Sequence, residues 1–303
     1  MPGNTAEYIA QRKKDINAII LAHFYQIPEI QDVADFVGDS LQLAQQAAAT
    51  DAEVIVFCGV SFMAESAKIL NPAKTVLLPD LQGQCPMAAM VTAEQLKKKK
   101  AEHPGAVVVS YINSSAEVKA ESDICCTSSN AVKVVESIPA DKPIIFVPDK
   151  NLGRYIQDQT ERPMILWEGC CPIHDVLTVE QIEEQRKNHP HALLVVHPEC
   201  PQEVTRRADA VRSTAGILKY VQTSSAAEFI IGTEEGFLHT LNKNCPGKKF
   251  HLARSGFRCE DMKYITLEKL ASALKNMEFQ VEVDDDIRER ASNSLQRMLA
   301  IAP

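Results

Sequence analysis

Three cysteines recur at nearly equal spacing along the chain and could together hold a metal. Cys85, Cys171 and Cys259 are separated by 86 and 88 residues, and each follows an apolar run. The chain has nine cysteines, an odd number, which does not suggest a disulfide framework. Three thiolates around one axis favour a soft metal centre. An iron–sulfur cluster with one open iron, a zinc site that includes His174, and three buried thiols without a metal are the alternatives, and the spacing favours the cluster.

Polar side chains recur with the same period at the ends of three apolar runs. The runs AIILAHFY, AVVVSYIN and ALLVVHPE begin at residues 18, 106 and 192. Short runs of this kind are typical of buried strands in parallel sheets, and ligands bind beyond the carboxyl ends of such strands. We therefore expect one cavity lined by His23, Tyr25, Tyr111, Asn113, His197 and Glu199. Glu199 is the candidate proton-transfer carboxylate, with a structural salt bridge as the alternative.

Hydroxyl residues introduce a helix in each copy. Ser40, Ser128 and Thr214 stand at the predicted turn from loop to helix, in the strings GDS, TSS and STAG. Helix N-termini offer free N–H groups to carboxylates and phosphates. Plain N-capping is the alternative, but convergence on one cavity would favour a small polyanionic ligand.

The elements that must position these residues form a threefold internal repeat. Similar helices are predicted from Thr5, Thr92, Thr178 and Thr266, each with threonine as N-cap. Aspartates 35, 123 and 209 stand in register, and two more strands follow in each copy, the last of which ends at the recurring cysteine. The pattern predicts an α/β fold of three homologous α/β/α three-layer domains, with short parallel sheets around a central active site on a pseudo-threefold axis. The expected domains are residues 1–91, 92–177 and 178–303, the last with C-terminal capping helices.

Composition excludes several classes of protein. The 303 residues are 45% hydrophobic and 24% charged, as in ordinary globular proteins rather than disordered or collagen-like ones. No apolar run approaches the length of a membrane span. The net charge of −8 argues against nucleic-acid binding through a basic surface. The first residues lack an apolar secretory segment, so we expect a cytoplasmic protein without membrane or nucleic-acid partners.

Several longer strings resemble one known family. LAHFYQIPEIQDVADFVGDS, CTSSNAV, WEGCCPIHDVL and HPEC occur in the order found in quinolinate synthases, the iron–sulfur enzymes of bacterial and archaeal NAD biosynthesis. The resemblance covers most of the chain, from near residue 18 to near residue 275. It implies condensation of iminoaspartate with dihydroxyacetone phosphate to quinolinate, with release of phosphate and two waters. It also implies a 4Fe–4S cluster on Cys85, Cys171 and Cys259, and a partner enzyme that supplies iminoaspartate.

The resemblance also implies roles for individual residues. The expected catalytic residues are Glu199, Tyr25, Tyr111 and His23. The expected substrate contacts are His23, Ser40, Tyr111, Ile112, Asn113, Ser128, His174, His197, Pro198, Glu199, Ser213 and Thr214. Four positions depart from the family pattern, namely Gln84, Ala89, Cys170 and Arg212.

Two other interpretations remain open. The first is a radical enzyme that resembles those of diphthamide synthesis, which also have three copies with one cysteine each. The second is an iron–sulfur sensor or carrier that binds a small anion without turnover.

Overall fold

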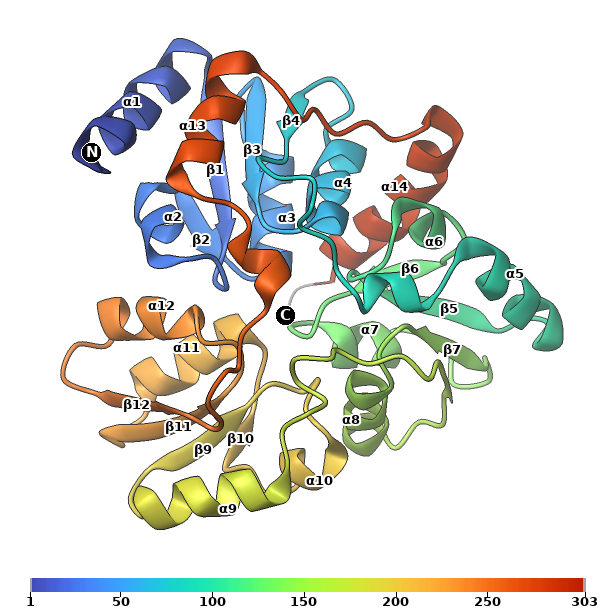
Figure 1. The fold of residues 1–303 in the computed structure, drawn as a ribbon. Helices are drawn as coiled ribbons and strands as arrows, with labels where there is room; N and C mark the ends of the chain where they lie inside the picture. Colours follow the sequence, from blue (N-terminus) through green and yellow to red (C-terminus); the bar gives the residue numbers. More distant parts are fainter. Residues whose placement is uncertain (1, 302–303) are drawn as a thin grey trace.

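Three parallel sheets with the same strand order form the framework of the protein (Figure 1). The computed structural model describes residues 2–301. Their strand orders are β2-β1-β3-β4, β6-β5-β7-β8 and β10-β9-β11-β12, and all pairs are parallel. The strands are β1 (Ala18–His23), β2 (Phe36–Gly38), β3 (Val54–Cys58), β4 (Thr75–Leu77), β5 (Val107–Tyr111), β6 (Ile124–Cys126), β7 (Ile144–Val147), β8 (Ile165–Leu166), β9 (Leu193–Val196), β10 (Ala210–Val211), β11 (Glu228–Gly232) and β12 (Lys249–Leu252). The predicted triplicated α/β architecture is confirmed.

Each sheet has one strand more than the sequence pattern predicted. The extra strands β2, β6 and β10 are only two or three residues long, too short to show a period of their own. The recurring aspartate before each of them explains the pairing. Asp35, Asp123 and Asp209 accept a hydrogen bond from the backbone N–H of the central strand at 2.9, 2.7 and 2.7 Å, and their own N–H groups donate back to that strand. The repeated aspartate therefore anchors the edge strand in every copy.

Helices cover both faces of the sheets. The helices are α1 (Pro2–Asp15), α2 (Pro28–Val33), α3 (Ser40–Ala49), α4 (Ser61–Leu70), α5 (Ala93–Glu102), α6 (Ala116–Ala120), α7 (Ala131–Glu136), α8 (Lys150–Thr160), α9 (Val179–Asn188), α10 (Gln202–Thr205), α11 (Thr214–Thr223), α12 (Phe237–Asn244), α13 (Leu267–Asn276) and α14 (Asp285–Leu299), with 3-10 turns at Ala88–Met90 and Glu260–Lys263. In the third sheet, alternate residues of β9 and β11 pack against α11 and α12 on one face and against α9 and α10 on the other. This is the expected three-layer arrangement.

Threonine caps three of the four repeated helices. Thr92, Thr178 and Thr266 each accept a hydrogen bond from the backbone N–H three residues on, as predicted. The prediction for Thr5 was wrong, because α1 already begins at Pro2 and places Thr5 inside the helix. No helix within residues 2–301 is long and apolar enough to cross a membrane.

The C-terminal helices lie on the first two repeats. Helix α13 packs on α1, and α14 packs against α6, β6 and α4 (Figure 1). Their buried residues Leu270, Leu295 and Met298 belong to the same apolar core as strands β1 and β3. The domain boundaries at residues 91 and 177 stay predictions.

Candidate active site and metal centre

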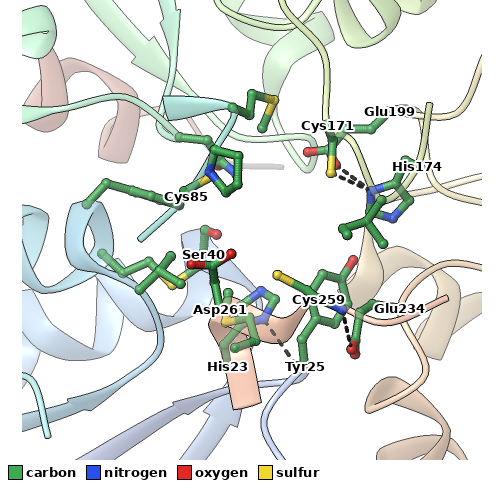
Figure 2. A pocket seen from close by; sticks show the side chains of 18 of the residues that line it. His23, Tyr25, Ser40, Cys85, Cys171, His174, Glu199, Glu234, Cys259 and Asp261 are labelled. Atoms are coloured by element: carbon green, nitrogen blue, oxygen red, sulfur yellow. Dashed lines mark hydrogen bonds and ion pairs between the residues drawn. The ribbon is translucent and has the colours of Figure 1, made fainter. Parts of the chain in front are cut away.

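A cavity lies where the loops of the three repeats meet (Figure 2). Thirteen of the predicted site residues line it: His23, Tyr25, Ser40, Cys85, Tyr111, Asn113, Ser128, Cys171, His174, His197, Glu199, Thr214 and Cys259. Three others do not. Ile112 is buried in the apolar core, while Pro198 and Ser213 line an outer groove that adjoins the cavity at Asp39 and Ser128.

The three recurring cysteines stand in loops rather than at strand ends. Cys85, Cys171 and Cys259 follow the edge strands β4, β8 and β12 by several residues, so the expectation that those strands end at the cysteines was wrong. The loops turn the thiols inward, and Figure 2 shows the three sulfurs on different sides of the cavity. Cys170 does not line the cavity, which distinguishes it from its neighbour Cys171.

The separation of the three thiols argues against a single shared ion. Within residues 2–301, no set of three metal-binding groups whose ligand atoms lie within 4.8 Å of one another contains Cys85, Cys171 and Cys259 together. Tetrahedral zinc with Zn–S bonds of about 2.3 Å requires sulfurs about 3.8 Å apart. As placed here, the three sulfurs are too widely spaced to share one zinc ion. Burial raises the pKa of Cys85 to about 12 and that of Cys259 to about 11, so a bound cation is needed to make these thiols ligands at neutral pH.

Two carboxylates that the sequence reasoning missed hold the cysteine loops. Asp149 accepts a hydrogen bond from the backbone N–H of Cys171 at 3.2 Å, and Glu234 accepts one from the N–H of Cys259 at 3.1 Å. Lys263 pairs with Glu234 at 2.8 Å. Asp149 and Glu234 occupy matching positions just beyond β7 and β11. Because ligands bind beyond the carboxyl ends of parallel strands, the ends of β7 and β11 already pointed to both residues.

His23 and His197 are neutral hydrogen-bond donors toward the cavity. In each, Nδ1 accepts the backbone N–H two residues on, from Tyr25 at 3.2 Å and from Glu199 at 3.3 Å. Because Nδ1 accepts, the ring proton must sit on Nε2. Burial is the main reason that the pKa of each ring falls from 6.5 to about 3, so both rings stay uncharged at neutral pH. His197 Nε2 lies 3.2 Å from Ser128 Oγ.

Glu199 is a buried carboxylate that stays ionised. Its side chain is almost fully buried, yet it accepts hydrogen bonds from Tyr111 Oη at 2.6 Å and His174 Nδ1 at 2.8 Å. Burial raises its pKa, but the hydrogen bonds from His174 and Tyr111 favour the carboxylate and lower the pKa below its usual value. The residue therefore combines negative charge with exclusion from bulk water.

A chain of hydrogen bonds joins Glu199 to Tyr25. His174 Nε2 lies 3.0 Å from Thr233 Oγ1, which lies 2.6 Å from Tyr25 Oη. With the Glu199 contacts above, the chain runs continuously from Tyr111 through Glu199, His174 and Thr233 to Tyr25. Burial first, and Glu199 next, raise the pKa of both tyrosines, so both hydroxyls keep their protons. Such a chain can move a proton between its members.

Helix N-termini from the first and third repeats border the cavity. Ser40 and Thr214 are the first residues of α3 and α11, and both line it. The caps are their neighbours Asp39 and Ser213, which each accept a backbone N–H. Ser129 Oγ donates to Asp39 at 2.6 Å and lies 2.8 Å from Ser213 Oγ, so one hydroxyl ties the three repeats together.

One buried atom in the cavity wall is unpaired. Asn113 Oδ1 finds no hydrogen-bond partner within residues 2–301, although it is buried. An unsatisfied buried acceptor is costly, so this atom is available to a donor group of a ligand.

The structure shows the surroundings of three positions that depart from the family pattern. Gln84 lines the cavity and accepts a hydrogen bond from Ser61 Oγ at 2.8 Å. The guanidinium of Arg212 donates to the backbone carbonyl of Val211 at 2.7 Å and lines the outer groove instead of the cavity. Ala89 lies in the 3-10 turn after Cys85.

Fold and site together define a class of protein, namely triplicated α/β chains in which each repeat contributes one cysteine to a shared central cavity. The chain belongs to the quinolinate synthetase A family, whose family model matches residues 7–300. A quinolinate synthase of Desulforudis audaxviator is 57% identical over 293 residues, which cover 97% of each chain. Those of Methanoregula boonei (54% identical, 97% of each chain) and Rippkaea orientalis (49%, all of this chain and 94% of its own) are also similar. The predicted family resemblance is confirmed.

Proposed function

We propose that this protein is a quinolinate synthase. It condenses iminoaspartate with dihydroxyacetone phosphate to quinolinate, with release of phosphate and two waters. The observation that carries the proposal is the convergence, in a chain of this family, of one cysteine loop from each repeat and the polar strand ends on one cavity.

The cofactor in this proposal is a 4Fe–4S cluster held by Cys85, Cys171 and Cys259. Three half-buried thiols from three repeats, too widely spaced for one zinc ion, suit a cluster with three protein ligands. When bound, such a cluster supplies an open iron that acts as a Lewis acid toward a substrate oxygen.

Glu199 moves protons during imine formation, enolisation and ring closure. It is ionised, lies next to Tyr111 and His174, and is shielded from water. A proton that reaches the carboxylate can be shared with His174 and passed along Thr233 toward Tyr25. A positioned acid–base group of this kind typically increases the reaction rate by a factor of roughly 10²–10⁴.

The remaining polar groups bind the anionic substrates without adding charge. The Nε2–H group of His23 donates into the cavity, that of His197 orients the cavity-lining Ser128 hydroxyl, and the starts of α3 and α11 provide N–H groups for carboxylate or phosphate. The free carbonyl oxygen of Asn113 accepts from the substrate nitrogen. We place the enzyme in the cytoplasm, supplied with iminoaspartate by another enzyme.

Anaerobic purification tests this proposal. We expect purified protein with bound iron and sulfide to form quinolinate from the two substrates, and activity to decay in air together with the visible absorbance of the cluster. Unchanged turnover by protein shown to contain no iron would refute the cluster's role. Iron and sulfide without turnover would favour a sensor or carrier, and a requirement for S-adenosylmethionine would favour the radical enzyme.

A further inference from the structure

A second group of metal-binding side chains lies in the third repeat, away from the central cavity. His189 follows α9, Glu228 is the first residue of β11, and His251 lies in β12. The central cavity lies beyond the carboxyl ends of the strands, where Glu234 follows β11. Glu228 and Gly232 stand at opposite ends of that strand, roughly 13 Å apart. The two groups of residues are therefore separate sites.

The three side chains converge on one point. His251 Nε2 lies 2.8 Å and His189 Nδ1 lies 3.3 Å from the same oxygen, Glu228 Oε1. All the ligand atoms lie within 4.8 Å of one another, and the side chains are about a quarter exposed. Tetrahedral coordination with bonds of about 2.1 Å separates ligand atoms by about 3.4 Å. The His189–Glu228 distance is close to that requirement, and the shorter His251–Glu228 contact is a hydrogen bond that an ion would replace.

The fold itself does not require this group of residues, as the other two repeats show. When the three sheets are aligned by their strand pairing, the position of Glu228 is occupied by Pro143 in the second repeat and by Val54 in the first. The position of His251 is occupied by Ile165 in the second repeat and by Leu77 in the first. Those sheets have the same strand order with no polar group at either position. The polar trio is thus an addition to the common scaffold.

We propose that His189, Glu228 and His251 bind one divalent transition-metal ion, with Zn²⁺ as the best match. Two imidazoles and a carboxylate are ligands that Zn²⁺ prefers, and a water would complete the coordination. The two rings are stacked with their planes 17° apart, so they must open from this stack to share an ion. Both side chains are partly exposed and can rotate.

The bound ion would hold the edge of the third sheet. Strand β12 pairs only with β11 in the sheet, and the chain runs from β12 to the loop that carries Cys259. An ion that joins α9, β11 and β12 fixes this edge strand in place. Because the ion binds the folded protein, it should also raise the melting temperature.

Zinc uptake by the cluster-loaded protein tests the proposal. Zn²⁺ is titrated anaerobically against a chromophoric chelator, with iron content measured before and after to show that the central centre is unchanged. We expect wild-type protein to bind one Zn²⁺. The His251→Ile variant should bind it at least about tenfold more weakly, since even loss of a partner outside the ligand shell lowers metal affinity by roughly 10–100-fold. The isoleucine is the residue that the second repeat already accepts at this position.

Two further variants complete the test. His189→Gln should also lose the zinc, and it alters only a half-buried position after a helix. His103→Gln is the matched control, because His103 ends α5 in the second repeat as His189 ends α9, but it belongs to neither group of metal-binding side chains among the described residues. Equal zinc binding by wild type and both ligand variants, or loss in His103→Gln as well, would overturn the proposal. So would failure of the wild-type protein to bind Zn²⁺ at micromolar concentration.

Discussion

Glu199→Gln tests the assignment of proton transfer to this residue with little change in shape. The glutamine oxygen can accept from Tyr111, and its NH₂ group can donate to His174 Nδ1. His174 would then carry its proton on Nε2 and donate it to Thr233, which lies at hydrogen-bonding distance. The contact between His174 Nδ1 and Cys171 Sγ at 3.2 Å changes, but Tyr111, His174 and Thr233 keep hydrogen-bond partners, so the fold should persist.

The expected effects on stability and on rate differ widely in size. Two charge-assisted hydrogen bonds become neutral ones, a loss of at most about 2 kcal/mol, and removal of a buried charge offsets part of it. The melting temperature should fall by no more than roughly 8 °C. Turnover loses the positioned base and should fall by roughly 10²–10⁴.

The assay compares kcat for quinolinate formation with both substrates saturating, under anaerobic conditions and at matched iron content. Glu203→Gln is the control, because Glu203 lies nearby in the sequence but is exposed at the start of α10. A kcat for Glu199→Gln close to that of Glu203→Gln, with iron intact, would show that the buried carboxylate has only a structural role.

Three further predictions follow from the same geometry. Cys171→Ser should lose the bound iron while Cys170→Ser keeps it, since of the two only Cys171 lines the cavity. Iron and sulfide that stay in Cys171→Ser but are lost from Cys170→Ser would refute this. Arg212→Gly should bind substrate at least as tightly and turn over no more slowly, because the guanidinium lies in the outer groove; a tenfold rise in KM would reveal a substrate clamp instead. Burial lowers the pKa of His197 to about 3, so the unfolded state binds more protons below about pH 6.5 and stability falls as the pH drops through that range. His197→Gln should reduce this acid sensitivity, and melting curves that shift with pH as much as those of the wild type would contradict it.

The repeat architecture could be predicted because it depends on local patterns. A short apolar run such as that from Ala18 indicates a strand by itself, since strands of parallel sheets are buried on both faces. A period of 86 to 88 residues then places Cys85, Cys171 and Cys259 in equivalent loops. The short strand β10 could not be predicted, because two residues carry no pattern and its pairing depends on Asp209.

The amino-acid sequence alone determined that three copies of one unit exist, which polar residues follow their strands, and which three cysteines are equivalent. Only the tertiary structure decided that Glu199 pairs with His174 and Tyr111, and that Ser129 joins Asp39 to Ser213. The physical reason is that repeat spacing is a property of neighbouring residues along the chain. Side-chain partners and burial in the cavity depend on groups from different repeats, which meet only when the three sheets pack around one centre.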